Sequence, residues 1–256
     1  MMGPLDGRHA LITGGGTGIG AAIARALAGA GAAVSLVGRR REPLEQLAAT
    51  QPRATAIVAD VTREGDVQAM VDTARTAHGA IDILIANAGA AESAPFAKLD
   101  LVHWQRMLEV NLTGAFLSAK AALPDLTRPG ASGTRIVFVS STAGLKGYAY
   151  VAAYCAAKHG LVGLARALAV ELAPRGVTVN AVCPGYTETP LLEASLANIA
   201  AKTGLTRDDA EASLKRLNPQ GRFISPEEVA ATVLWLCTPA AQAVTGQAIS
   251  VSGGEV

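Results

Sequence analysis

The sequence predicts an α/β protein in which helices cover both faces of a doubly wound parallel sheet. Strand-like and helix-like segments alternate along the whole chain, which is typical of βαβ units. The strand-like segments are continuously apolar, as expected for strands that are buried on both faces. No repeat, low-complexity tract or linker divides the 256 residues. We therefore expect residues 1–256 to form a single domain around a sheet of about seven strands.

The predicted elements follow this alternation in order. Strands are predicted at residues 8–13, 33–38, 54–58, 81–86, 135–140, 177–182 and 248–252. Helical patterns occupy residues 18–30, 65–78, 101–123 and 151–173, and a last helix begins at the capping sequence Ser225-Pro226-Glu227-Glu228. Because 50% of the residues are hydrophobic and only 4% are aromatic, Ala, Val, Leu and Ile should form the core.

Residues 186–222 differ from the rest of the chain. Two short helices, 191–202 and 207–216, are predicted there and are joined by Thr203-Gly204. They lie between the sixth strand and the last helix, a position from which they could cover a substrate pocket. We expect a helical lid at about residues 186–222. An insertion with a purely structural role is the alternative.

Charge and composition exclude several classes of function. The formal net charge is +1, which favours neither nucleic acid nor an anionic membrane as a partner. The uncharged stretch 229–254 is interrupted by Pro239 and Gly246, so no membrane span is predicted. The cysteines, Cys155, Cys183 and Cys237, lack metal-ligand spacing, and we expect buried free thiols and no metal site. Without a recognisable signal peptide, the expected location is the cytoplasm.

A glycine-rich turn follows the first strand. The segment Thr13-Gly-Gly-Gly-Thr-Gly-Ile-Gly20 lets the backbone turn tightly, and the next helix directs free N–H groups toward it. Such a turn is suited to the phosphates of a dinucleotide. The spacing Gly14-x-x-x-Gly18-x-Gly20 departs from the general GxGxxG pattern. A flexible strand–helix turn without a ligand is the alternative.

The second strand ends at Gly38, and Arg39, Arg40 and Arg41 follow it. In dinucleotide-binding sheets an acidic residue near this point binds the ribose hydroxyls, whereas an arginine accommodates a 2′-phosphate. The sequence therefore favours NADP(H), with NAD(H) as a possible cofactor. The alternative is that the arginines only solvate the start of a helix.

Tyr154 and Lys158 are the first candidates for catalysis. They stand four residues apart in a predicted helix and so share one of its faces. We expect the ammonium to lower the pKa of the phenol and make it a usable acid and base. Ser141, at the end of the fifth strand, could donate to a substrate carbonyl oxygen. Ser140 is the neighbouring candidate, but successive strand residues face opposite ways, and we choose Ser141.

Other polar residues follow the predicted strands at the same edge of the sheet. Asp60 comes after the third strand and could accept a hydrogen bond from an adenine amino group, and Asn87-Ala88-Gly89 forms a turn after the fourth. Asn111 lies inside the predicted helix 101–123, where asparagine is unfavourable. It marks either a local distortion of that helix or a solvent-facing position.

Together these segments resemble the short-chain dehydrogenase/reductase family over nearly the whole chain. The resemblance rests on six patterns in the expected order: Thr13-Gly-x-x-x-Gly-x-Gly20, Asn87-Ala-Gly89, Asn111, Ser141, Tyr154-x-x-x-Lys158 and Pro184-Gly185. It implies a Rossmann-like fold and an oxidoreductase that interconverts a ketone and a secondary alcohol. It also implies that Tyr154 is the general acid/base, Ser141 polarises the carbonyl, Lys158 contacts the nicotinamide ribose, and Asn111 holds a water that links Lys158 to solvent.

The resemblance also implies the cofactor contacts and an assembly. Gly14, Gly18 and Gly20 would bind the pyrophosphate, Asp60 the adenine and Thr189 the carboxamide. Further contacts are expected from Gly16, Thr17, Ile19, Arg39, Val61, Asn87, Ala88, Gly89, Tyr154, Lys158, Pro184, Gly185 and Thr187. A homodimer or, more often in the family, a homotetramer is expected, with Gly160 and Gly163 suited to close helix packing.

The substrate is the least determined feature. Residues 184–193 and 156–160 are similar to bacterial 3-hydroxybutyrate dehydrogenases, but Ala143 and Val151 replace the His and Lys that hold the substrate carboxylate there. This favours a 3-oxoacyl thioester on coenzyme A or carrier protein. A hydrophobic or aromatic ketone and free 3-hydroxybutyrate are the alternatives. Lys146 is expected to be solvated or to meet an anionic tail.

Two functions of other classes also fit the sequence. One is an NADP-binding regulator without turnover, which the intact set of Ser141, Tyr154 and Lys158 disfavours. The other is a redox-neutral enzyme on the same fold, such as an epimerase, which would form product with no net change of cofactor.

Overall fold

The computed structural model describes residues 3–256, over which seven strands form one parallel sheet. The strand order is β3-β2-β1-β4-β5-β6-β7. The strands are β1 (His9–Thr13), β2 (Ala33–Gly38), β3 (Ala54–Val58), β4 (Ile83–Ala86), β5 (Arg135–Val139), β6 (Thr178–Pro184) and β7 (Ala248–Val251). The direction of winding reverses between β1 and β4, and open sheets of this kind bind ligands at the carboxyl ends of the strands beside that reversal. The predicted fold class is confirmed.

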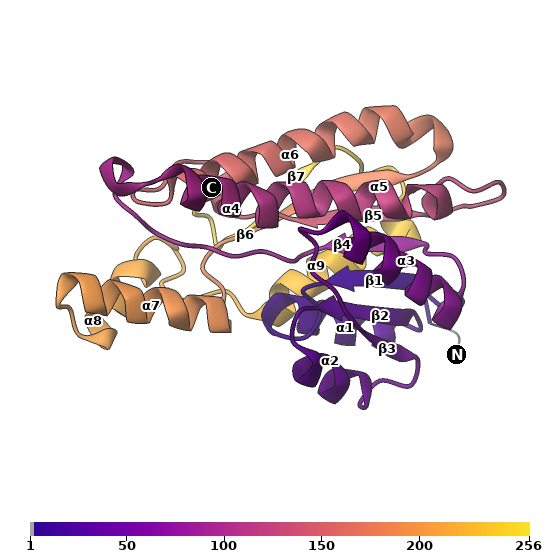
Figure 1. The fold of residues 1–256 in the computed structure, drawn as a ribbon, viewed down its shortest axis with the longest axis horizontal. Helices are drawn as coiled ribbons and strands as arrows, with labels where there is room; N and C mark the ends of the chain where they lie inside the picture. Colours follow the sequence, from indigo (N-terminus) through magenta and orange to yellow (C-terminus); the bar gives the residue numbers. More distant parts are fainter. Residues whose placement is uncertain (1–2) are drawn as a thin grey trace.

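Helices cover the sheet in two layers (Figure 1). One layer contains α1 (Gly18–Gly29), α2 (Arg41–Ala48) and α9 (Pro226–Cys237), and the other contains α3 (Glu64–His78), α5 (Gly114–Leu126) and α6 (Ala152–Leu172). Helix α4 (Leu101–Leu108) lies beside α6. Helix α2 was not predicted; it is a short helix that begins at Arg41, three residues after the end of β2.

The apolar strands supply both cores. In β1, Leu11 packs into the core under α3, α5 and α6, while its neighbour Ile12 packs under α1, α2 and α9. Both side chains are 0% exposed. Burying an aliphatic side chain of this size stabilises a fold by about 1.5–3 kcal/mol. Continuous apolarity in these strands therefore reflects burial on both faces, as predicted.

The predicted continuous helix 101–123 is wrong. The segment forms α4, a π-helical turn over Glu109–Thr113, and then α5, which extends to Leu126. Asn111 lies in the π-helical turn and is 1% exposed, so the predicted local distortion is confirmed and the solvent-facing alternative is excluded. Such turns within helices are frequently found at functional sites.

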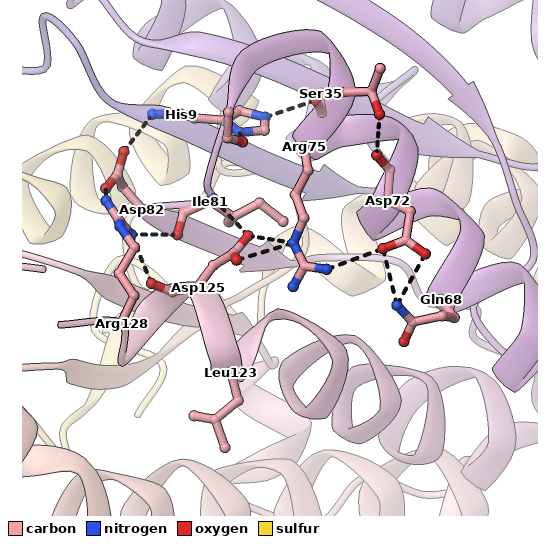
Figure 2. A network of polar contacts seen from close by, with 12 residues as sticks. His9, Ser35, Gln68, Asp72, Arg75, Ile81, Asp82, Leu123, Asp125 and Arg128 are labelled. Carbon is pink, nitrogen blue, oxygen red and sulfur yellow. Dashed lines mark hydrogen bonds and ion pairs between the residues drawn. The ribbon is translucent and has the colours of Figure 1, made fainter.

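Hydrogen bonds and ion pairs form a network at the amino-terminal ends of the strands (Figure 2). Asp125 on α5 accepts hydrogen bonds from Arg75 on α3 at 2.9 and 3.0 Å and from the Ile81 backbone at 2.9 Å. Asp82 accepts from Arg128 at 2.6 Å and from the His9 backbone at 3.0 Å. These buried or half-buried carboxylates tie the ends of α3 and α5 to β1 and β4. The carboxyl-terminal ends of the strands carry the candidate site instead.

Residues 186–222 contain α7 (Pro190–Thr203) and α8 (Arg207–Lys215), which extend away from the sheet (Figure 1). They share a small core of their own, formed by Leu192, Leu196, Ala210, Leu214 and Phe223. The two predicted helices are confirmed. Among residues 3–256, no helix combines the length and apolarity required to span a bilayer.

The cysteines are free thiols, but they differ in exposure. Cys183 and Cys237 are buried, as predicted, whereas Cys155 is only partly buried. The prediction of burial is wrong for Cys155, which lies in the first turn of α6 and is not among the buried residues of that helix.

Candidate active site

The glycine-rich turn joins β1 to the start of α1 and has the geometry that only glycine accommodates well. Gly14 and Gly18 have φ angles of +66° and +53°. A Cβ at Gly20 would lie 2.1 Å from the Gly14 carbonyl oxygen, so no side chain fits there. Because α1 begins at Gly18, its free N–H groups face the turn. The chain thus provides backbone N–H donors for a phosphate-sized anion at the end of β1.

Asn87, which we predicted as a cofactor contact, uses its side chain to hold this turn. Its amide Nδ2 donates to the carbonyl oxygens of Thr13 at 2.9 Å and Gly14 at 3.2 Å. In return, Thr13 Oγ1 accepts from the backbone N–H groups of Asn87 and Ala88, each at 3.0 Å. Sequence reasoning missed this role of Thr13. A hydroxyl at the end of an otherwise apolar strand was the signal for it.

A pocket of about 140 Å³ opens between the glycine-rich turn and the end of β2. Its lining contains two guanidinium groups and no carboxylate, and consists of Gly14, Gly16, Thr17, Gly38, Arg39, Arg40, Pro43 and Leu44. Arginine binds phosphate oxygens in a bidentate manner, so the pocket suits a phosphorylated ribose. The residues present therefore fit the dinucleotide that the sequence predicts.

Asp60 and Val61 lie past the end of β3. Burial raises the pKa of Asp60, but hydrogen bonds from Thr62 and the nearby charge of Arg39 outweigh it, and the net effect is a lowered pKa. The carboxylate accepts from Thr62 N at 3.0 Å and from Thr62 Oγ1 at 2.8 Å. Val61 packs against α5, where a Cβ at Gly114 would lie 2.7 Å from Val61 Cγ2. Asp60 is thus an ionised acceptor close to Arg39.

Ser141, Tyr154 and Lys158 come together at the carboxyl end of β5. Tyr154 and Lys158 lie one turn apart on α6, and the Lys158 ammonium is 5.6 Å from the centre of the Tyr154 ring. A side-chain hydrogen bond with Ser141 acts to lower the pKa of the Tyr154 hydroxyl. Ser140 instead faces under α6, where its hydroxyl donates to the Lys158 carbonyl oxygen at 3.1 Å. The geometry thus favours Ser141 over Ser140, as the alternation of strand residues predicts.

The expected lowering of the Tyr154 pKa is not seen. Burial raises the pKa of Tyr154 to about 12, although the hydrogen bond with Ser141 opposes this rise. Burial also lowers the pKa of Lys158 to about 8. The Lys158 ammonium donates to the Val139 carbonyl oxygen at 2.9 Å and lies over the ring. The prediction failed because it counted the attraction between the two groups and not the cost of burying both.

Asn111 supports the segment beside Lys158. Its amide Nδ2 donates to the carbonyl oxygens of Ala90 at 2.8 Å and Met107 at 3.0 Å, and its Oδ1 accepts from Ala90 N at 3.2 Å. A Cβ at Gly89 would lie 2.8 Å from Asn111 Oδ1 and 3.6 Å from Lys158 Nζ. Gly89 therefore lies between Asn111 and the catalytic candidates, and its missing side chain leaves that space open.

The segment after β6 returns to the glycine-rich turn. Thr187 Oγ1 donates to the Gly185 carbonyl oxygen at 2.9 Å. Thr189 caps α7 by accepting from Leu192 N at 3.3 Å, and its Cγ2 would lie 3.1 Å from a Cβ at Gly18. The predicted contacts Pro184, Gly185, Thr187 and Thr189 thus lie opposite the turn, on the other side of the strand reversal.

Glu255 is a site residue that sequence reasoning missed. Its side chain is 1% exposed, accepts a hydrogen bond from Tyr148, and pairs with the Lys146 ammonium at 3.1 Å. Lys146 is thus paired within the chain while its side chain stays 36% exposed, so it is only partly solvated, and its contact with an anionic tail stays a prediction. Nothing in the sequence around a glutamate next to the C-terminal residue indicated this position.

Comparison with known proteins agrees with the geometry. Residues 8–200 match a family model described as short chain dehydrogenase. A cis-4-hydroxycyclohexanecarboxylate dehydrogenase of Sinomonas cyclohexanicum is 41% identical over 252 residues, 96% of each chain. The granaticin polyketide synthase putative ketoacyl reductase 1 of Streptomyces violaceoruber is 38% identical, over 96% of this chain and 92% of that protein.

Solved structures show the same likeness. The crystal structure of a single-residue variant of actinorhodin polyketide ketoreductase with NADPH is 35% identical and superposes with a TM-score of 0.94, covering 100% of this chain and 99% of the other. The crystal structure of levodione reductase is 33% identical, with a TM-score of 0.92 and 98% coverage of both chains.

Proposed function

The chain belongs to the short-chain dehydrogenase/reductase family, and we infer that it is an NAD(P)-dependent oxidoreductase that interconverts a ketone and a secondary alcohol. We propose that Tyr154, Ser141 and Lys158 carry out this reaction on a 3-oxoacyl thioester. The observation that supports the proposal most is their convergence at the carboxyl end of β5, beside the strand reversal.

In this mechanism each residue has one task. A bound nicotinamide supplies the hydride when the ketone is reduced. The Ser141 hydroxyl donates a hydrogen bond to the substrate oxygen, and Tyr154 transfers its proton to that oxygen as negative charge develops there. Lys158, whose pKa burial lowers to about 8, can return a proton to the phenol. Asn111 holds the 89–90 segment beside Lys158 and thereby keeps this path open.

NADP(H) is the proposed cofactor. Arg39 and Arg40 line the pocket beside the glycine-rich turn, and Gly38 stands where a carboxylate would bind the ribose hydroxyls. The actinorhodin ketoreductase, at 35% identity, was crystallised with NADPH, which supports the same choice for this chain.

The proposed substrate class rests on charge near the catalytic set. Ala143 is buried and apolar, and Val151 begins the turn into α6, so neither offers a carboxylate partner. The ketoacyl and 3-oxoacyl reductases among the relatives are named for substrates of the proposed class. A cyclic ketone is the second candidate, because the cis-4-hydroxycyclohexanecarboxylate dehydrogenase is named for a ring substrate.

The test follows NADPH or NADH absorbance with acetoacetyl-CoA, a cyclic ketone and an aromatic ketone. We expect NADPH consumption with acetoacetyl-CoA to be the fastest of these reactions. Binding of NADPH without its consumption by any ketone would point instead to a regulator, and product without net cofactor change would point to an epimerase.

We also propose a homotetramer of single-domain subunits in which residues 186–222 act as a lid. Apolar side chains remain exposed on α4, α5 and α6, among them Leu101 at 66%, Phe116 at 44% and Val170 at 80%, and a second subunit could cover them. Gly160 packs within the chain, since a Cβ there would lie 2.9 Å from Leu112 Cδ2, whereas a Cβ at Gly163 would meet nothing within 4 Å outside its own helix. The free thiols fit the reducing cytoplasm.

A further inference from the structure

The C-terminal tail places a carboxylate beside the substrate-binding side of the sheet. After β7 the chain turns back through Gly253 and Gly254, whose φ angles are +65° and +93°. A Cβ at Gly253 would lie 2.1 Å from Asn218 Oδ1, so the tail packs tightly against the end of the 186–222 segment. The turn brings Glu255 back to the end of β6, where its Oε2 would lie 3.2 Å from a Cβ at Gly185.

This carboxylate is connected to the catalytic set through aromatic side chains. Tyr148 donates to Glu255 and also contacts the Thr142 hydroxyl at 2.7 Å, next to Ser141. The Tyr148 ring packs edge-to-face on Tyr186, with ring centres 6.4 Å apart. Tyr186 is in turn close enough to Tyr154 to raise the pKa of that phenol. Glu255 therefore lies in the wall of the same site, behind Tyr148 and Tyr186.

Glu255 also neutralises the cation nearest to it. Lys146 Nζ is 3.1 Å from Glu255 Oε1 and donates to the Glu255 carbonyl oxygen at 3.3 Å. The Lys146 side chain is 36% exposed and lies over the Tyr148 ring, with the ammonium 5.1 Å from the ring centre. A buried carboxylate in direct contact with this ammonium leaves the pair without net charge, so the Lys146 ammonium attracts a second anion much less than a free ammonium would.

We propose that Glu255 is a specificity-determining residue that restricts the enzyme to substrates without a carboxylate near the reacting carbonyl, by holding the Lys146 ammonium in an ion pair and so withholding it from the substrate. The inference rests on the proposed oxidoreduction and narrows its substrate class to thioesters, esters and neutral ketones. The proposed exclusion does not apply to charged groups far from the carbonyl, such as the phosphates of coenzyme A.

The test compares matched acids and esters in wild type and in variants of the pair. For acetoacetate against ethyl acetoacetate, and for 4-oxocyclohexanecarboxylate against its ethyl ester, the readout is the acid-to-ester ratio of kcat/KM with NADPH. We expect Glu255→Gln to raise this ratio about tenfold or more, because it frees the Lys146 charge. Lys146→Met should lower the ratio, since the buried carboxylate then stands alone. The double variant should return it close to the wild-type value.

A control separates this effect from general loss of ion pairs. Glu64→Gln removes an exposed pair between α3 and Lys120 on α5, outside residues 186–222, and should leave the ratio unchanged. The inference is overturned if Glu255→Gln changes the ratio by less than about twofold, or if its rise persists in the double variant. Should Glu255→Gln fail to fold, as judged by circular dichroism, the direction of change in Lys146→Met decides the outcome.

The role of Glu255 in specificity can still be tested if the proposed oxidoreduction is wrong. If neither ester consumes NADPH with any variant, the oxidoreduction proposal is wrong. The acid-to-ester ratio of calorimetric affinities for the protein with NADPH then replaces the kinetic ratio, with the same expected and overturning results.

Discussion

Tyr154 lies where its proton is held firmly in the free protein. Burial raises the pKa of Tyr154 to about 12, so the phenol is protonated at neutral pH. A protonated phenol is the form that ketone reduction requires, because the substrate oxygen takes up a proton in that direction. Alcohol oxidation requires the phenolate, and this must come from interactions that form when cofactor and substrate bind.

Replacing the hydroxyl of Tyr154 tests its proposed role. We expect Tyr154→Phe to bind NADPH as wild type does, because the ring is retained, and to lower kcat by roughly 10²–10⁴-fold. Fluorescence titration measures the first quantity and steady-state turnover the second. Turnover close to wild type would exclude Tyr154 as the proton donor.

Arg39 is the residue on which the proposed cofactor preference depends. It lines the pocket beside the glycine-rich turn and approaches the ionised Asp60. We expect Arg39→Ala to weaken NADPH binding by about tenfold or more, and to change NADH binding little, because only NADPH carries the 2′-phosphate. Dissociation constants for both cofactors decide this. Equal losses would show that Arg39 does not contact the phosphate.

At the scale of the element, the strand-to-helix turn between β1 and α1 depends on glycine at a fixed position. Gly20 leaves no room for a Cβ, whereas nothing lies within 4 Å of a Cβ at Gly29 in the same helix. Gly29 is thus a matched control for the intrinsic effect of replacing glycine in a helix.

We expect Gly20→Ala to lower the affinity for NADPH by about tenfold or more, because the added carbon displaces the Gly14 carbonyl that shapes the turn. Gly29→Ala should leave the affinity unchanged and stabilise the protein by roughly 0.4–1 kcal/mol. Cofactor titration and urea denaturation of both variants provide the measurements. A similar affinity in both variants would contradict a tight fit at Gly20.

The α4–α5 segment shows how an element adapts to a site. The sequence between residues 101 and 123 is compatible with one continuous helix, yet Asn111 introduces a π-helical turn. The side-chain amide of Asn111 forms hydrogen bonds with the backbone of Ala90 and Met107. Leaving such a buried polar group without a partner would cost about 1–3 kcal/mol. The hydrogen bonds across to residue 90 therefore favour the distortion over a regular helix.

At the scale of the whole molecule, the two ends of the parallel strands have different roles. The edge where the strands end carries the glycine-rich turn and the catalytic candidates. The edge where they begin carries the network around Asp82 and Asp125, which connects α3 and α5 to the sheet (Figure 2). His9 lies at this second edge, 2% exposed, with its ring nitrogens 2.9 Å from Ser35 Oγ and 2.9 Å from the Gly79 carbonyl oxygen.

This arrangement makes global stability sensitive to acid. Burial lowers the pKa of His9 and of His78 from the ordinary value of 6.5. Below that value the unfolded chain binds more protons than the folded protein, so the free energy of unfolding falls as pH decreases below about 6.5. The slope is at most about 1.4 kcal/mol per pH unit for each histidine.

Urea denaturation between pH 8 and pH 5 measures this dependence. His9→Gln should show a shallower loss than wild type, because glutamine does not titrate in this range. Identical slopes in the two proteins would mean that His9 does not contribute.

The sequence by itself determined the sheet and its strands, and it named the candidate site residues that the fold brings to the carboxyl ends of the strands. Local signals were sufficient for these: continuous apolar runs for buried strands, glycines for the turn after β1, and the i, i+4 spacing of Tyr154 and Lys158 on α6. Each of these properties depends on residues that are neighbours in the chain. The choice of Ser141 over Ser140 as the candidate serine also came from the alternation of side chains at the end of β5, and Ser140 indeed donates to the Lys158 carbonyl oxygen.

Only the tertiary structure decided the features that join distant segments. Asn87 holds the turn 74 residues before it, Asn111 bends its helix to reach Ala90, and Glu255 pairs with Lys146 at a separation of 109 residues. The pKa of Tyr154 belongs to this group as well, because it depends on how much water the folded chain removes from the phenol. Burial and long-range pairing are properties of the packed molecule, and no pattern of sequence neighbours records them.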